Sequence, residues 1–347
     1  MLSFLLFAGA LHVKFEDLKE NWAPIALLAT IGVTISILIV SSLIYLASRS
    51  LGVDLSPSYA LVFGCLISPT DPIAVLGILK NAKVSKSLET QITGESLFND
   101  GVGVVLFIAA LSIATQSVAP DSPKDLPWVE LGMFFIQEAV GGIAFGLILG
   151  YAVYRILRSI DDYKVEILTT VAAVFGGMTV ASHLHFSAPL SMVVIGLFIG
   201  NQGRKSAMSK LTLKRLDDFW ELIDEILNAV LFVFLGLELI VIPFNLKFLS
   251  LGFSAIFIVL LARAISIALP MSLLSRFRWT FGARTMAVMT WGGLRGGISV
   301  ALALQIPDLE VRQLLLVSTY CVVVFSILVQ GLTLKKLITW KTSGNAT

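Results

Sequence analysis

The sequence predicts an all-α, polytopic membrane protein, and three observations support this fold class. Hydrophobic side chains make up 56% of the 347 residues and charged ones only 14%, whereas soluble proteins average about 25% charged residues. The apolar runs are continuous and long enough for membrane-spanning helices, without the alternation of a transmembrane β-barrel. Basic residues also alternate between successive connecting segments. These features exclude a soluble enzyme, a disordered chain and a disulfide-stabilised secreted domain.

The whole chain, 1–347, reads as a single transmembrane domain with ten full spans and a partial span over 1–13. At about 20 residues per crossing, the full spans are 22–48, 58–79, 91–116, 128–154, 165–183, 187–203, 217–241, 248–275, 284–304 and 313–334.

Charge placement gives these spans an orientation. Of the 25 Lys and Arg residues, 19 lie in one alternate set of connecting segments and 4 in the other. The positive-inside rule places the segments with 19 basic residues, together with the C-terminus, in the cytoplasm. We expect the membrane to be the plasma (inner) membrane of the cell. By the same alternation the partial span starts outside the cell, so we expect upstream spans to be absent from this chain.

The polar composition limits the possible partners. A net charge of +2 argues against nucleic acid. The two cysteines, Cys65 and Cys321, lie inside apolar runs and lack the spacing of a disulfide framework or a metal centre. We therefore expect no cofactor, and the apolar spans make the lipid bilayer the expected partner.

Seven ionisable residues lie inside the predicted spans. Each costs about 2.5–3.5 kcal/mol if it faces lipid, so such groups pair, take up protons or line a wet cavity. Two of them, Glu138 and Glu238, stand apart from any motif, and we interpret them as structural carboxylates. The seven are Asp71, Glu95, Asp100, Glu138, Glu238, Arg263 and Arg295.

Two of the spans carry helix-breaking residues near these charges. Ser-Pro-Thr-Asp-Pro at 68–72 places Pro69 and Pro72 in one span, where proline removes a backbone donor. Trp-Gly-Gly-Leu-Arg-Gly-Gly at 291–297 interrupts another span. Two interrupted helices in separate halves are typical of a transporter's midplane binding site, although glycines can also form a close-packing face. The glycines are Gly292, Gly293, Gly296 and Gly297.

A third motif, Gly-Glu-Ser-Leu-Phe-Asn-Asp-Gly at 94–101, supplies oxygen ligands. Glu95 and Asn99, like Ser96 and Asp100, are four residues apart and share a helical face. At about 1.5 Å per residue, Asp100 lies about 14 Å from the cytoplasmic end of its span, near the midplane. Carboxylate, hydroxyl and amide oxygens suit a small hard cation. A carboxylate in such a site binds a proton or the cation, and this competition is the simplest basis for exchange.

In sequence order, these three motifs resemble the NhaP-type bacterial and archaeal sodium/proton antiporters. Those proteins belong to the cation:proton antiporter family that includes the animal sodium/proton exchangers. The resemblance runs from about Leu5 to Leu337. It implies an inverted-repeat fold with two crossing, interrupted helices, a homodimer, and a chain that lacks the first two spans of the family.

The resemblance also implies roles for the motif residues. It makes Asp100 the carboxylate that takes either the cation or the proton, with Asp71, Thr70 and Ser96 around the ion. For the transported Na⁺, the expected ligands are Asp100, Asp71 and Ser96. Asn99 is also expected among the ion- and proton-binding residues, and it occupies the position that accompanies electroneutral exchange in the family.

Two further implications concern an ion pair and a missing glutamate. Glu95 resembles the family glutamate that pairs with an arginine, here Arg263 or Arg295. The chain has Ala8 where relatives often carry a glutamate, which in some of them contributes to the ion site.

The sequence therefore predicts a secondary transporter, not an enzyme, that exchanges cytoplasmic Na⁺ or Li⁺ for external H⁺ by alternating access. A potassium/proton antiporter or a cation channel is the alternative within transport, because sodium and potassium both prefer oxygen ligands. An intramembrane aspartyl protease using Asp71 and Asp100 is a remote alternative. Such enzymes carry an aspartate after a Gly-x-Gly sequence, whereas here Gly101-Val102-Gly103 is followed by Val104.

Overall fold

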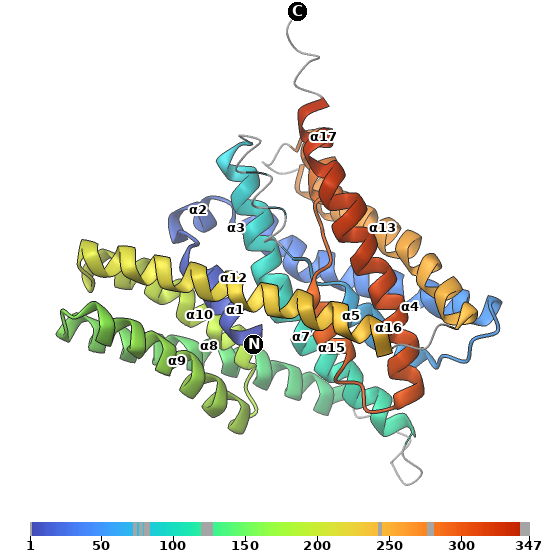
Figure 1. Cartoon of the computed structure of the whole chain (residues 1–347), viewed down its shortest axis with the longest axis horizontal. Helices are drawn as coiled ribbons and strands as arrows, with labels where there is room; N and C mark the ends of the chain where they lie inside the picture. Colours follow the sequence, from blue (N-terminus) through green and yellow to red (C-terminus); the bar gives the residue numbers. More distant parts are fainter. Residues whose placement is uncertain are drawn as a thin grey trace, which may run out of the picture. The chain divides into compact units, whose positions relative to one another are not determined.

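The computed structural model describes residues 2–71, 75, 79, 84–118, 128–241, 245–275 and 281–340. All regular elements in this part of the chain are helices (Figure 1), which confirms the predicted all-α class. Helices suit these apolar runs because they satisfy every backbone N–H and C=O within the segment. The helices form two compact units, residues 1–20 with 126–234 and residues 21–125 with 235–347.

The first unit is built around a short helix, α10, that contacts α1 and α8. Ser187 caps α10 by accepting a hydrogen bond from the Leu190 N–H, and a proline stands in the first turn. Gly196 lets α10 approach the backbone of α1 at Phe7, because a Cβ there would meet the Phe7 carbonyl at 2.7 Å. The helices of this unit are α1 (Leu2–Leu11), α2 (Phe15–Glu20), α8 (Trp128–Ser159), α9 (Tyr163–His183), α10 (Ala188–Phe198), η2 (Ile199–Gly203), α11 (Arg204–Ser206) and most of α12 (Lys210–Val241).

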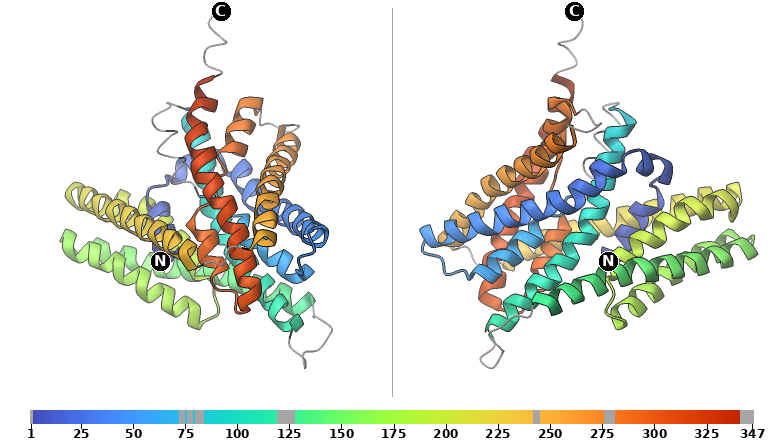
Figure 2. Two further views of the ribbon diagram at one scale, coloured as in Figure 1. Left: turned by 45° about the vertical axis from the view of Figure 1, so that its right-hand side comes forward. Right: turned by 180° about the vertical axis from the view of Figure 1, so that it is seen from behind.

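In the second unit, α13 contacts both α4 and α16, while α5 contacts α4 and α7, as Figure 2 shows from two further sides. Gly64 permits the close approach of α5 to α4, where the side chain of Ser41 occupies the space of a Cβ. The helices are α3 (Trp22–Leu27), η1 (Leu28–Gly32), α4 (Val33–Ser50), α5 (Pro57–Ile67), α7 (Lys86–Val118), α13 (Leu246–Ser275), α14 (Ala283–Trp291), α15 (Gly297–Ala303), α16 (Leu309–Phe325), η3 (Ser326–Gly331) and α17 (Leu332–Trp340).

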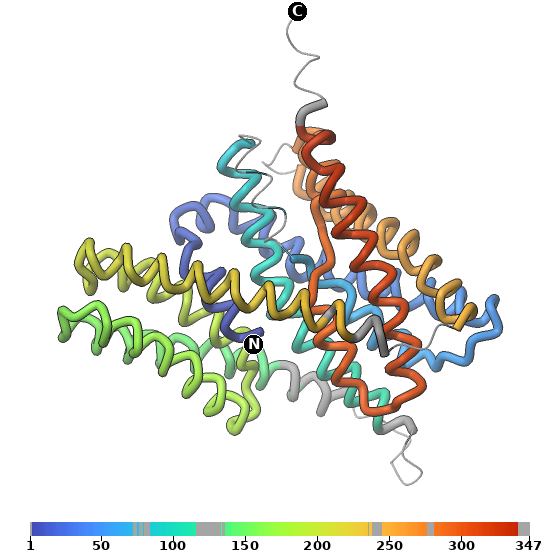
Figure 3. Tube along the Cα trace, viewed as in Figure 1, coloured from blue at the N-terminus to red at the C-terminus, as the bar shows by residue number. Residues whose placement is uncertain are grey.

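Two helices of this unit are interrupted at the predicted motifs. Helix α5 ends at Ile67, the backbone is non-helical over 68–71, and helical backbone returns at Val75 and Leu79. Pro72 lies outside the described residues. Between α14 and α15 the chain is uncoiled, and Figure 3 traces it as a nearly straight segment.

The two interruptions meet. The Asp71 N–H donates a hydrogen bond of 2.8 Å to the Leu294 carbonyl oxygen, so the breaks satisfy each other's backbone groups. The expected pair of crossing, interrupted helices is therefore confirmed.

Among the described residues, six helices are long and apolar enough to cross a bilayer. They overlap the predicted spans that carry no break or short helix, with bounds that differ by several residues, and are Trp22–Ser50, Lys86–Thr115, Ile136–Ser159, Tyr163–His183, Leu246–Ser275 and Leu309–Ile338. The predicted spans 58–79 and 284–304 contain the interruptions, 187–203 forms α10 with η2 and ends just before α11, and 217–241 lies in α12. The count of ten spans, and the partial span that corresponds to α1, stay predictions.

Candidate cation-binding site

The central element of the candidate site is α7, which runs unbroken through the motif at 94–101. Four polar residues on successive turns are almost completely buried. An exposed fraction of 3% for Asp100 places a carboxyl group where water is largely excluded. Glu95, Ser96 and Asn99 share this burial, so each needs a partner within the protein.

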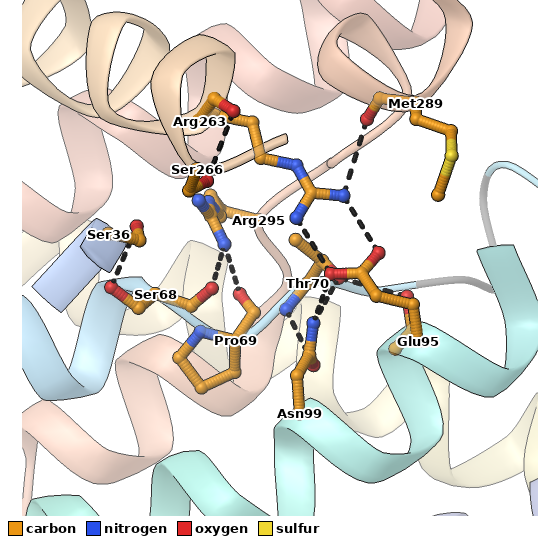
Figure 4. Close-up of polar contacts among 11 residues, drawn as sticks. Ser36, Ser68, Pro69, Thr70, Glu95, Asn99, Arg263, Ser266, Met289 and Arg295 are labelled. Atoms are coloured by element: carbon orange, nitrogen blue, oxygen red, sulfur yellow. Dashed lines mark hydrogen bonds and ion pairs between the residues drawn. The ribbon is translucent and has the colours of Figure 1, made fainter. Parts of the chain in front are cut away.

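Thr70, in the first interruption, receives three contacts from α7 (Figure 4). Its hydroxyl lies 2.9 Å from the Ser96 hydroxyl and accepts a hydrogen bond of 2.8 Å from Asn99 Nδ2. Its backbone N–H donates to Asn99 Oδ1 at 3.3 Å. The amide of Asn99 therefore holds the non-helical segment against α7 and brings two hydroxyl oxygens together.

The two aspartates of the motifs lie in the same region. The charged side chains that interact electrostatically with Asp100 are Asp71, Glu95 and Arg295. Asp100 Oδ1 is buried and has no hydrogen-bond partner among the described residues. The carboxylate of Asp71 packs against Gly296, in the space that a Cβ would fill. Two carboxylates and two hydroxyls thus gather at the crossing, a set of hard oxygens suited to a small cation.

Glu95 forms a buried, two-pronged ion pair with Arg263 of α13. Arg263 Nη1 donates to Glu95 Oε1 at 2.7 Å and Nη2 to Oε2 at 2.8 Å. Asn99 Nδ2 donates to the same Oε1 at 2.8 Å, and Arg263 Nη2 also reaches the Met289 carbonyl at 3.3 Å (Figure 4). Both oxygens of Glu95 are therefore occupied by donors, which leaves this carboxylate poorly placed to coordinate a cation.

Arg295 does not share that ion pair, although the sequence left it as a possible partner. Its Nη1 donates to the carbonyls of Ser68 and Pro69, the latter at 2.7 Å (Figure 4). The reason is the break itself, because ending α5 at Ile67 frees carbonyl oxygens that a buried environment requires to be paired. Arg295 Nε and Nη2 have no hydrogen-bond partner among the described residues.

Several contributors to the site escaped the sequence analysis. The carbonyls of Ser68, Pro69 and Met289 accept hydrogen bonds from the arginines. Every residue has a backbone carbonyl, so the residue type does not indicate which carbonyls take part. Ser326, whose hydroxyl accepts from the Arg295 N–H at 2.9 Å, sits in an apolar span four residues before Gln330. That spacing of two polar residues on one helical face is the signal that could have identified it.

Other residues singled out in the sequence lie elsewhere. Ala8 is buried in α1, in the first unit. Glu138 is buried in α8 of that unit, and its carbonyl accepts a hydrogen bond from the Ser187 N–H. Glu238 belongs to α12, and its side chain lies outside the described part of the chain.

Comparisons with known proteins are consistent with one another. A family model described as "Sodium/hydrogen exchanger, transmembrane" matches residues 1–340. The chain is 48% identical over 340 residues to the Na⁺/H⁺ antiporter NhaP of Pseudomonas aeruginosa, with 97% of this chain and 79% of that protein covered. It is 36% identical over 342 residues to the Na⁺/H⁺ antiporter NhaH of Halobacillus dabanensis, covering 97% and 81%.

The fold has a counterpart among solved structures. The sodium/proton antiporter MjNhaP1 of Methanocaldococcus jannaschii, at pH 8, superposes with a TM-score of 0.79 and 19% identity. The match covers 97% of this chain and 83% of that one. At this level of identity the likeness concerns the fold.

Proposed function

The chain belongs to the sodium/hydrogen exchanger family, and on this premise we propose that it is a secondary transporter that exchanges cytoplasmic Na⁺ for external H⁺. One observation carries the proposal. The buried Asp100 carboxylate, with an oxygen that lacks a hydrogen-bond partner among the described residues, lies on α7 one turn from the Ser96 hydroxyl that contacts Thr70.

Asp100 is the group that cation and proton share. A buried carboxylate is costly as an isolated anion, and it becomes tolerable when it binds a cation or takes up a proton. Asp71, Thr70 and Ser96 supply the remaining oxygens around Na⁺ or Li⁺. Because the two states of Asp100 exclude each other, entry of one ion requires release of the other, and the site opens alternately to the two sides.

The exchange is electroneutral, one cation for one proton. The residue beside Asp100 is the amide Asn99, which carries no charge and is engaged by Thr70 and Glu95. Glu95 is neutralised by Arg263 and takes no part in the proton balance. A single titrating carboxylate then moves one charge in each direction.

The remaining expectations concern the surroundings. We place the protein in the plasma membrane as a homodimer with its C-terminus in the cytoplasm. Potassium/proton exchange is the second candidate, because hydroxyl and carboxylate oxygens serve both cations.

Proton movement in everted membrane vesicles tests the function. An imposed proton gradient is followed with a fluorescent dye while NaCl, LiCl or KCl is added to vesicles with and without the protein. Sodium and lithium are expected to dissipate the gradient only where the protein is present. A response to potassium alone would replace the sodium proposal with the potassium one, and no response to any of the three would refute antiport.

A further inference from the structure

The break between α14 and α15 removes a specific backbone hydrogen bond. In a continuous α-helix the N–H of residue 295 would donate to the carbonyl of residue 291. Here those two groups lie on either side of Gly292 and Gly293. The hydrogen bond of the Arg295 N–H is buried and that of the Trp291 carbonyl is part-buried, and within a bilayer such groups need partners from the protein. The hydrogen-bond partners of these two groups therefore determine whether the interruption between α14 and α15 is stable.

Two side chains of η3 take the place of that bond. The Arg295 N–H donates to Ser326 Oγ at 2.9 Å, and the Ser326 hydroxyl donates to Gln330 Oε1 at 2.8 Å. Gln330 Nε2 then donates to the Trp291 carbonyl at 3.0 Å. Every donor in this relay has one acceptor, and the chain of bonds runs in one direction from residue 295 to residue 291.

The relay is buried and belongs to a distorted part of its helix. Ser326 is 0% and Gln330 4% exposed. Segment η3 is π-helical over Ser326–Gly331, and such bulges occur frequently at functional sites. In a low dielectric, aligned hydrogen bonds strengthen one another, so a fully satisfied relay stabilises the open geometry.

The open break in turn positions the site. Leu294 accepts the Asp71 N–H, and Arg295 holds the carbonyls of Ser68 and Pro69. The position of the segment that carries Thr70 and Asp71 thus depends on Leu294 and Arg295, and the relay holds the backbone at Arg295. We propose that Ser326 and Gln330 are positioning residues for cation binding, which replace the missing helical hydrogen bond and keep the α14–α15 break open.

This inference rests on the proposed function, and kinetic constants test it. Ser326→Ala and Gln330→Met each remove the relay with little change in volume. We expect each to raise the KM for sodium roughly tenfold, because buried groups lose their partners, while the maximal rate stays within about twofold since Asp100 is untouched. The double variant should be no worse than the worse single one, because either change breaks the same relay.

Ser318→Ala is the matched control. Ser318 lies in the adjoining helix α16 and is equally buried, and its hydroxyl donates to the Leu314 carbonyl of its own helix at 3.0 Å, the single hydrogen bond of that hydroxyl among the described residues. Its KM for sodium should remain that of the wild type. Thermal unfolding of all variants in one detergent separates misfolding from mispositioning.

Gln330→Glu gives a readout that general destabilisation would not produce. Its carboxyl can donate to the Trp291 carbonyl only when it is protonated. The ratio of the KM for sodium of this variant to that of the wild type, both measured at the same pH, should be near one at acidic pH and rise as the pH increases.

The outcomes separate the two proposals. An active wild type whose KM is unchanged by Ser326→Ala and Gln330→Met, or equally changed by Ser318→Ala, overturns the inference alone. A ratio for Gln330→Glu that does not depend on pH also overturns it. A wild type without cation-dependent exchange overturns the proposed function and the inference with it.

Discussion

At the scale of single residues, neighbouring carboxylates on α7 have different surroundings. Glu95 receives donors on both oxygens from Arg263 and a third from Asn99. Asp100, slightly more than one turn further along, keeps an oxygen without a partner among the described residues. The first arrangement favours a permanent anion, and the second fits the exchanging role proposed for Asp100.

Asp100→Asn should abolish exchange while the protein still folds. The amide keeps the size and polarity of the side chain but removes the negative charge that is proposed to bind the cation and the proton in turn. Sodium-dependent dissipation of a proton gradient in vesicles should fall to the background of protein-free membranes. The unfolding temperature in detergent should be unchanged or higher, because a charge that is costly to bury has been removed. Exchange at wild-type rates would disprove the role of Asp100.

Glu95→Gln should destabilise the fold as well as reduce transport. Removing one partner strands the Arg263 guanidinium in a buried environment, which costs about 3–5 kcal/mol. The unfolding temperature of the detergent-solubilised protein should drop clearly.

Glu16→Gln is the matched control for that variant. It makes the same chemical change in the exposed pair in which Lys205 Nζ lies 2.7 Å from Glu16 Oε1, and solvent-exposed pairs contribute little. If Glu95→Gln unfolds like the wild type but has lost stabilisation by sodium, Glu95 is a cation ligand and the division of roles proposed here is wrong.

At the scale of elements, the site depends on how closely the second interruption approaches the first. Gly296 stands at the start of α15, and its missing side chain leaves the space that the Asp71 carboxylate fills. Gly103 of α7 makes similar room for the Pro69 ring. Glycine is required at these positions for the close approach of two segments.

Gly296→Ala should therefore impair transport by displacing Asp71. A Cβ at this position overlaps the carboxylate, and we expect the rate of sodium-dependent exchange to fall at least about tenfold. Gly282→Ala, just before α14, is the control because no atom of the described residues lies within 4 Å of its Cβ position. Equal rates for the two variants in the vesicle assay would contradict the placement of Asp71.

At the scale of the whole molecule, charge movement distinguishes the possible exchange ratios. One titrating carboxylate beside Asn99 predicts that a cation replaces a proton without net current. When the membrane potential of vesicles is set with valinomycin and potassium gradients, the initial rate of sodium-dependent exchange should stay constant. A rate that follows the imposed potential would show that more than one proton accompanies each cation.

The sequence by itself determined the class of the molecule and identified most residues of the candidate site. Continuous apolar runs permit only helices in a bilayer, and prolines or glycines within them mark where those helices break. The polar side chains at 68–72 and 94–101 can be predicted as candidate ligands without a structure, because polar and charged groups in lipid are too costly without a function or a partner.

Only the tertiary structure decided how those residues are paired. Depth along the helices places Arg263 near the level of Glu95 and Arg295 nearer that of Asp100, but depth alone does not establish which side chains form the ion pair. The partner of each arginine depends on where the ends of helices leave backbone carbonyls unpaired. Side-chain identities in the sequence do not indicate those positions. For the same reason the relay through Ser326 and Gln330 was not apparent in the sequence. The backbone groups that it pairs, the Arg295 N–H and the Trp291 carbonyl, lack helical partners only because the helix is broken between α14 and α15.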